Sequence, residues 1–330
     1  MSMRVIHATR FGGPEVLVAG DAPEPSAGPG RVVVEVAAAE VLFLDTQLRA
    51  GWGGEYFTLK PPYVPGTGVA GAVISVGDGV DPAWIGRQVI ARTLSGTTGG
   101  YAQLAEAAAE EVFEVPDGMD LREALAALHD GLMALSCTAK AHIQPGERVL
   151  VGAAGGSLGI WLVPLAHAAG AHVIAAARGP QKLDLARQLG ADTLIDYSQP
   201  DWSDQVRAAT DGAGVDVVFD GAGGQLGRSA FEITVRGGRF LAYGAASGEF
   251  APIKPHEAEQ QQIIVVGILD DPLTPEDQQR LTRQALAEIA AGNIHPVIGQ
   301  TFPLDRAADA HAAIEARTVV GKTLLLTKRT

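Results

Sequence analysis

A chain of 330 residues is longer than one hydrophobic core usually supports, so its length predicts two domains. The composition, with 47% hydrophobic and 19% charged residues, is that of a folded globular protein and excludes a disordered chain. The formal net charge of −13 is spread along the sequence. It argues against nucleic acid and anionic membrane as partners, because both select basic surfaces.

Targeting signals and disulfides are not expected in this chain. The amino-terminal segment 1–7 has a strand pattern and lacks the apolar core of a signal peptide. No apolar run reaches the ~18 residues of a membrane-spanning helix. Cys137 is the one cysteine, which excludes an internal disulfide and a zinc lobe built from several cysteines. We therefore expect a cytoplasmic protein.

The first 120 residues contain short β-like runs separated by glycine and proline. Strands are predicted over 31–37, 69–76 and 88–91, with a turn at Gly28-Pro29-Gly30. This pattern is typical of an antiparallel, β-rich domain with short helices.

From Leu121 the pattern changes to alternating helices and strands. A helix is predicted over 121–143, ended by Pro145-Gly146. Strands are then predicted over 149–151, 172–177, 193–195, 215–219, 239–243 and 263–268. The alternation indicates a doubly wound, six-stranded parallel sheet, in which a ligand binds at the carboxyl ends of the strands.

The last part of the chain is predicted to hold helices over 275–291 and 307–316 and a final strand over 322–326. That strand has no partner left in a completed parallel sheet, so we expect it to return to the first domain. The expected domains are therefore 1–120 together with 269–330, and 121–268.

The strand over 149–151 runs directly into a glycine-rich turn and a helix. Residues 154, 156 and 159 have the spacing of the G-x-G-x-x-G dinucleotide fingerprint, with alanine in the first place. Small residues allow a tight turn and close approach of the backbone to a pyrophosphate, and the helix N-terminus offers amide donors to it. We expect the dinucleotide to be bound by Ala154, Gly155, Gly156, Ser157, Leu158 and Gly159.

The end of the next strand predicts which dinucleotide binds. NAD sites place an Asp or Glu there for the ribose hydroxyls, but this strand ends in alanines up to Ala177. Arg178 and Lys182 follow, and both suit the 2'-phosphate of NADPH. The alternative is that both are ordinary surface cations. The missing acid favours NADPH.

Further motifs give the chain a family resemblance: Pro65-Gly66 with Gly71, the run from Pro145 to Gly156, Leu189-Gly190-Ala191, and Gly321-Lys322. On these residues the chain resembles the medium-chain dehydrogenase/reductase superfamily, in its zinc-free quinone oxidoreductase branch related to zeta-crystallin. The resemblance implies an α/β protein with a GroES-like catalytic domain, a Rossmann domain that binds NADPH, and a homodimer joined through the strand over 239–243 or its neighbour. It also implies cofactor contacts by Tyr197, Ala222, Gly244, Ala245, Ile268 and Lys322.

The chain departs from the zinc-dependent members of this superfamily. Leu42, Thr67 and Gly68 stand where those members carry zinc ligands, so no metal is expected. Without a Lewis acid, reduction of a quinone or an activated carbon–carbon double bond is easier to support than alcohol oxidation. In a conjugated acceptor the developing negative charge spreads onto a distant oxygen.

The expected substrate pocket is more apolar than the family pattern, because Leu42 and Met133 replace an Asn and a Thr of related proteins. The pocket is expected to comprise Leu42, Phe43, Trp52, His129 and Met133. Tyr56 is the candidate catalytic hydrogen-bond donor, with packing at the domain edge as its alternative. His129 is a second candidate, and its alternative is a structural histidine with satisfied hydrogen bonds.

These features favour an NADPH-dependent, zinc-independent reductase of quinones or α,β-unsaturated carbonyl compounds, acting on an apolar conjugated small molecule. An enoyl reductase of a polyketide or fatty-acyl pathway is a second reading. A non-catalytic NADPH-binding protein is a third, supported by the two polar groups that the pocket lacks.

Overall fold

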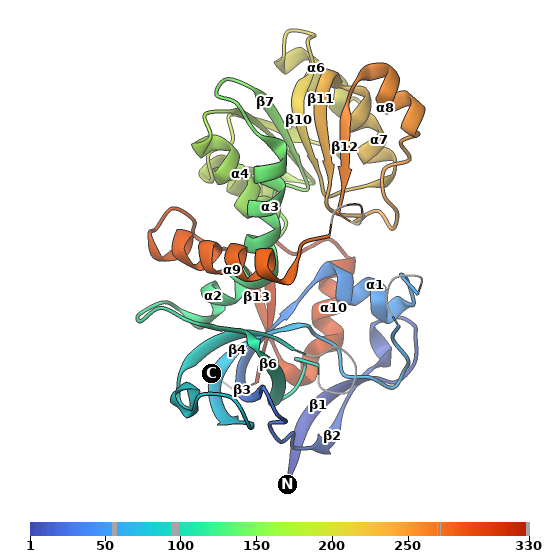
Figure 1. The fold of residues 1–330 in the computed structure, drawn as a ribbon. Coiled ribbons are helices and arrows are strands. Elements are labelled where there is room, and N and C mark those ends of the chain that lie inside the picture. Colours follow the sequence, from blue (N-terminus) through green and yellow to red (C-terminus); the bar gives the residue numbers. More distant parts are fainter. Residues whose placement is uncertain (55–57, 94–98, 269, 271, 328–330) are drawn as a thin grey trace. The chain divides into compact units, whose positions relative to one another are not determined.

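The computed structural model describes residues 1–54, 58–93, 99–268, 270 and 272–327, and the chain divides into two compact units (Figure 1). Unit 1 comprises Met1–His129 with Thr282–Thr330, and unit 2 comprises Asp130–Leu281. The divisions predicted from the sequence, at 120/121 and 268/269, lie about ten residues earlier.

Unit 1 is built on a six-stranded sheet in the order β13-β14-β3-β4-β5-β6, and a further pairing of β3 with β6 closes four of the strands on themselves. A separate two-stranded sheet joins β1 to β2. All pairings are antiparallel except that of β13 with β14. The strands are β1 (Ser2–Ala8), β2 (Leu17–Pro23), β3 (Arg31–Val41), β4 (Gly68–Val76), β5 (Gln88–Thr93), β6 (Leu104–Glu114), β13 (Ile298–Pro303) and β14 (Lys322–Leu326).

The final strand β14 pairs with β3, which confirms its predicted return to the first domain. Alternate residues of β3 point inward, and Val32, Val34 and Val36 are almost completely buried in a core shared with helix α10 (Ala307–Glu315). The other helical elements lying wholly in this unit are η1 (Pro14–Val16), α1 (Phe43–Ala50), η2 (Pro82–Trp84), α2 (Leu121–Ala126) and η4 (Leu304–Arg306).

Unit 2 contains a six-stranded sheet in the order β12-β11-β10-β7-β8-β9, and every pairing is parallel. This confirms the predicted doubly wound sheet. Its central strands are nearly continuous apolar runs because parallel strands are covered on both faces. The strands are β7 (Arg148–Gly152), β8 (His172–Ala177), β9 (Thr193–Asp196), β10 (Val215–Asp220), β11 (Thr234–Ala242) and β12 (Ile264–Gly267). The helices are α3 (Leu132–Ala141), α4 (Gly159–Ala168), α5 (Pro180–Gln188), α6 (Trp202–Ala209), α7 (Gly224–Glu232) and α8 (Pro255–Gln261).

Two elements run across the unit boundaries. The predicted single helix over 121–143 is instead interrupted by a π-helical segment, η3 (Ala127–Gly131), which separates α2 from α3. Such bulges insert a residue into the helical ladder and are frequent at functional sites. Helix α9 (Pro275–Ala290) spans the second boundary.

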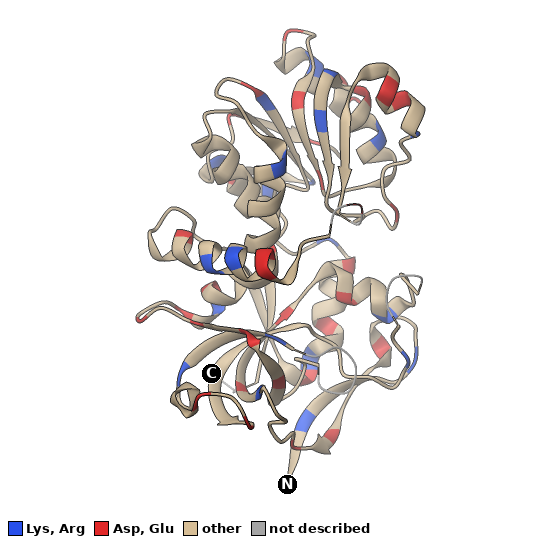
Figure 2. Cartoon of the chain, in the orientation of Figure 1, with Lys and Arg blue, Asp and Glu red and all other residues tan. Residues whose placement is uncertain are grey.

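Charged residues of both signs are interspersed over the elements of each unit (Figure 2). Among the residues that the structure describes, no helix combines the length and apolar character needed to cross a membrane.

Candidate cofactor and substrate residues

The glycine-rich turn between β7 and α4 is shaped by close backbone packing. A side chain at Gly155 would place its Cβ 2.5 Å from the Cβ of Lys182, and one at Gly159 would lie 2.5 Å from the carbonyl oxygen of Ala154. Helix α4 begins at Gly159 with no side-chain cap. The amides of Ile160 and Trp161 already donate to the carbonyl oxygens of Gly156 and Leu158, so donors to a phosphate group would come from the turn before them.

Four further predicted cofactor residues follow the carboxyl ends of neighbouring strands. Ala222 follows β10, Gly244 and Ala245 follow β11, and Ile268 follows β12. Because these strands run parallel to β7, their carboxyl ends share one edge of the sheet with the glycine-rich turn. The topology thus brings these positions to one sheet edge.

Asp220, at the end of β10, shapes this edge and was not identified from the sequence. Its Oδ1 accepts hydrogen bonds from the amides of Ala222 and Gly223, each at 3.0 Å. Its Oδ2 is buried without a hydrogen-bond partner. Burial raises the pKa of Asp220 to about 6, and these two amides lower it less. A cavity of about 10 Å³, roughly the size of one water, adjoins Asp220 and Tyr197.

The predicted 2'-phosphate residues lie at the start of α5. Arg178 is exposed, and Lys182 is partly buried. The structure adds Asp196 of β9, which pairs in register with Ala177. Hydrogen bonds from Ser198 and the charge of Arg178 hold the pKa of Asp196 below its usual range. An acid is therefore present here, but it lies on β9, the strand beside β8, whose end was predicted to lack one.

Three of the predicted pocket residues lie at the ends of helix α1 in unit 1. Leu42 precedes this helix, Phe43 begins it and Trp52 follows it, and all three are partly exposed. The guanidinium of Arg317 lies over the ring of Phe43, 4.5 Å from its centre. A cation therefore adjoins a position that was expected to be purely apolar. Met133 is partly exposed on α3 in unit 2, and Tyr56 lies outside the described residues.

The places of the zinc ligands hold a different arrangement. The carboxylate of Glu40 occupies the space beside Gly68, where an added Cβ would lie 1.9 Å from Glu40 Oε1. Glu40 Oε1 bonds to His129 Nδ1, and Oε2 pairs with Lys322 Nζ. Within the described part of the chain, no three His, Cys, Asp or Glu side chains are grouped to hold a metal ion.

This buried cluster of Glu40, His129 and Lys322 changes the interpretation of two predicted residues. Glu40 and Lys322 are completely buried, and the His129 side chain is 27% exposed. Burial raises the pKa of Glu40, but the charges and hydrogen bonds of His129 and Lys322 outweigh it and bring the value to about 2. Lys322 was expected to contact the cofactor. Its burial against Glu40 in unit 1 does not favour that contact.

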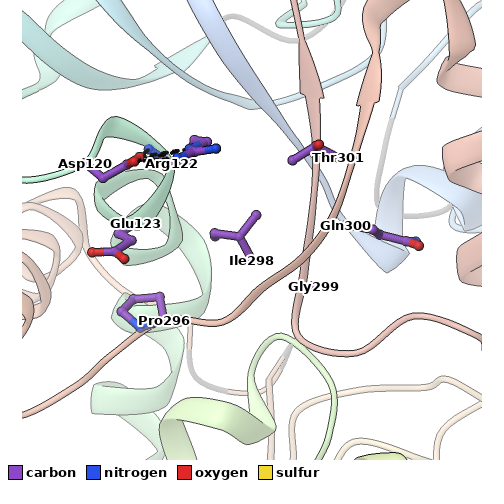
Figure 3. Close-up of a pocket in the computed structure, with 8 residues that line it drawn as sticks. All are labelled: Asp120, Arg122, Glu123, Pro296, Ile298, Gly299, Gln300 and Thr301. Atoms are coloured by element: carbon purple, nitrogen blue, oxygen red, sulfur yellow. Dashed lines mark hydrogen bonds and ion pairs between the residues drawn. The ribbon is translucent and has the colours of Figure 1, made fainter. Parts of the chain in front are cut away.

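Unit 1 also carries a surface hollow of about 470 Å³ beside strand β13 (Figure 3). Asp120 and Arg122 form an ion pair of 2.7 Å at its edge. The residues that line it are Asp120, Arg122, Glu123, Pro296, Ile298, Gly299, Gln300 and Thr301. None of them belongs to the predicted site.

Comparisons with known proteins match this architecture. Residues 28–117 match the alcohol dehydrogenase GroES-like domain, and residues 189–325 match the zinc-binding dehydrogenase family. A 2-haloacrylate reductase from Burkholderia sp is 34% identical over 332 residues, 98% of this chain and 98% of that protein. A quinone oxidoreductase from Pseudomonas aeruginosa is 32% identical, over 99% of this chain and 100% of that protein. The crystal structure of Escherichia coli quinone oxidoreductase complexed with NADPH has a TM-score of 0.89 at 27% identity, covering 99% of this chain and 100% of that one.

A GroES-like unit and a Rossmann unit with a glycine-rich turn define a two-domain oxidoreductase. The chain belongs to the medium-chain dehydrogenase/reductase superfamily, in its zeta-crystallin-like quinone oxidoreductase branch. The family and fold class predicted from the sequence are thereby confirmed.

Proposed function

We propose that the chain is an NADPH-dependent reductase that delivers hydride to quinones or α,β-unsaturated carbonyl compounds without a metal ion. The observation that carries the proposal is full-length similarity to proteins named for reduction of such acceptors, a quinone and a 2-haloacrylate. One relative of known structure, the Escherichia coli quinone oxidoreductase, is a complex with NADPH. The enzyme class and cofactor agree with the residues of unit 2.

NADPH, when bound, supplies the hydride, and this chain's residues hold it in place. The turn from Ala154 to Gly159, at the N-terminus of α4, would hold the pyrophosphate through backbone amides other than those of Ala154 and Gly156, which already donate to carbonyl oxygens. Arg178 and Lys182 offer charge-assisted donors to the 2'-phosphate. Asp220 fixes the loop after β10 through two amides, which keeps that strand end in the shape the cofactor requires.

The residues at the ligand positions support the proposed metal independence. Leu42 is apolar, and Gly68 has no side chain and lies against the carboxylate of Glu40. Both oxygens of that carboxylate already have partners, His129 and the cation Lys322, which compensates its charge. A conjugated acceptor requires no Lewis acid, because its own oxygen takes up the developing charge.

Steady-state NADPH oxidation with quinones, enones and enoyl thioesters tests this function. We expect turnover with quinones or enones, no stoichiometric zinc by elemental analysis, and an unchanged rate after treatment with a chelator. A zinc ion whose removal abolishes turnover would contradict metal independence. Turnover with enoyl thioesters alone would favour an enoyl reductase that acts on acyl chains. The absence of any turnover would favour a non-catalytic NADPH-binding protein.

The open edge of the unit 2 sheet supports the proposed homodimer. Strand β11 lies inside the sheet, so of the two strands expected at the interface only β12 offers an edge. Its Ile264 and Val265 are 59% and 36% exposed. An exposed apolar edge strand tends to pair with another strand. Pairing of β12 with β12 of a second copy across a two-fold axis would satisfy the backbone hydrogen bonds of both edge strands.

We expect Ile264→Lys to convert the dimer into a monomer, measured by light scattering at micromolar concentration. Ile85→Lys is the matched control, because Ile85 is similarly exposed, at 53%, in unit 1. A monomeric wild type, or a dimer that survives Ile264→Lys, would argue against this interface.

A further inference from the structure

We propose that His129 donates the proton that completes the reduction, and that Glu40 and Lys322 are positioning residues that orient its ring. This inference rests on the proposed function and deepens it. It names the proton donor of the site.

The cluster is built by three strands that meet at its carboxylate. Glu40 is next to the last residue of β3, Leu324 of β14 is its register partner, and Lys322 begins β14. On the other side, β4 begins at Gly68, whose missing side chain leaves room for the carboxylate. Both oxygens of Glu40 are therefore held from fixed directions, one by Lys322 and one by His129.

The carboxylate determines which ring nitrogen of His129 carries the fixed hydrogen. An ionised carboxylate can only accept, so Nδ1 of His129 is the donor to Glu40 Oε1. Among the described residues, Nε2 has no hydrogen-bond partner, and the side chain keeps 27% of its surface exposed. A partly exposed ring anchored through one nitrogen, with the other nitrogen not engaged, is the arrangement of an oriented acid or base.

The backbone of this segment is also fixed. Arg92 of β5 donates from Nη2 to the carbonyl oxygen of Leu128 at 2.9 Å, and its Nη1 pairs with Glu111 at 2.7 Å. His129 itself lies in the π-helical segment η3. Asp45 and Tyr101 are further titratable groups near Glu40; the Tyr101 hydroxyl donates to Asp45 at 3.2 Å and also hydrogen-bonds to His311 at 3.0 Å.

The proposed step balances in atoms and charge. The β-carbon of an enone receives a hydride, two electrons and one proton, from NADPH, which leaves as NADP⁺. The double bond shifts to give an enolate. The imidazolium of His129 gives its Nε2 proton to the α-carbon, directly or through water, and the carbonyl forms again. The neutral ring stays bonded to Glu40 and is reprotonated by water.

The alternative is that the cluster has a purely structural role and only connects η3 to β3 and β14. His129→Gln separates the two possibilities, because a glutamine can still donate to Glu40 but cannot transfer a proton near neutral pH. We expect kcat with an enone to fall by about 10²- to 10⁴-fold, the usual contribution of a general acid. The fall with a quinone should be smaller, since a hydroquinone anion collects its proton from water at oxygen.

The experiment measures kcat and KM as functions of pH with saturating NADPH. Wild type, His129→Gln, Tyr56→Phe (the other candidate donor) and His295→Gln are compared. His295 is an exposed histidine of the same unit and should leave kcat unchanged. The double variant Glu40→Gln/Lys322→Met removes the carboxylate charge beside the ring while leaving no unpaired buried charge, and it should lower kcat and alter the pH profile while KM stays within a fewfold. In the cofactor-free protein, NMR of the imidazole nitrogens should show a hydrogen-bonded Nδ1–H that His129→Gln removes.

The outcomes are distinct. Loss of enone turnover and of the pH dependence in His129→Gln alone supports the proposal. An active wild type with unchanged kcat and pH profile in His129→Gln overturns it, and the same loss in Tyr56→Phe alone assigns the proton to Tyr56. A wild type that reduces no acceptor overturns the proposed function itself. That result differs from an active wild type whose kcat does not change in His129→Gln, which overturns only the role of His129.

Discussion

Replacing Glu40 by glutamine should lower the free energy of unfolding of unit 1 by about 3–5 kcal/mol, the usual cost of removing one partner of a buried ion pair. The substitution leaves the ammonium of Lys322 completely buried without its counter-charge. Urea unfolding followed by tryptophan fluorescence measures the effect, with Trp52 and Trp84 in unit 1 and Trp161 and Trp202 in unit 2 replaced in turn by phenylalanine to separate the two signals.

Two variants make the stability experiment specific. The double variant Glu40→Gln/Lys322→Met should recover most of the loss, since a buried pair replaced as a whole costs little. Glu114→Gln breaks the exposed pair with Arg87, whose side chains are 52% and 44% accessible, and should cost less than about 1 kcal/mol. Equal effects of Glu40→Gln and Glu114→Gln would show that the buried cluster does not stabilise the fold.

Glu40 also makes the free energy of unfolding depend on pH, and the sign of that dependence follows from its lowered pKa. The pKa of Glu40 is about 2 in the fold against an ordinary value of 4.5, so the unfolded chain binds the proton first as the pH falls. Stability from Glu40 is therefore present above pH 4.5 and lost toward pH 2, by on the order of 3 kcal/mol. Asp45 and Asp220 act in the opposite direction, because burial raises the pKa of each to about 6. The difference between wild type and Glu40→Gln isolates the contribution of Glu40.

The sequence predicted the fold where local pattern determines structure. The apolar runs of unit 2 are long and regularly spaced, and all six parallel strands were found. Strands β2, β6 and β13 were missed because their patterns are weak. In β13, for example, exposed and half-buried residues alternate and none is fully buried. The π-helical turn within 121–143 was also missed, since one residue inserted into a helix hardly changes its apolar periodicity.

The candidate site was predictable only where its residues are close in the chain. The glycine-rich turn is one continuous motif, so spacing alone found it. Glu40 was overlooked although a carboxylate at the end of an apolar strand requires a partner. Its partners are His129, 89 residues away, and Lys322, 282 residues away, and only the folded sheet brings them together. Asp196 was missed for the same reason, because it lies on the neighbouring strand β9, opposite Ala177.

Discrimination between NADPH and NADH should depend on Arg178. We expect Arg178→Ala to weaken NADPH binding by about 10- to 100-fold, which corresponds to the roughly 1.5–3 kcal/mol of a hydrogen bond to a charged group. NADH binding should change little, because NADH has no 2'-phosphate. Fluorescence titration of both cofactors with wild type and variant measures this directly.

The carboxylate beside Arg178 makes the control important. Asp196 Oδ1 accepts hydrogen bonds from the backbone nitrogen and hydroxyl of Ser198 at 2.9 and 2.6 Å. That oxygen is thus engaged by its own turn rather than directed at a ribose. Arg187→Ala removes an equal charge from the far end of α5, where Arg187 pairs with Asp184, and should leave both affinities unchanged. If the wild type bound NADH as tightly as NADPH, Asp196 would be performing the role of the acid that the strand over 172–177 lacks.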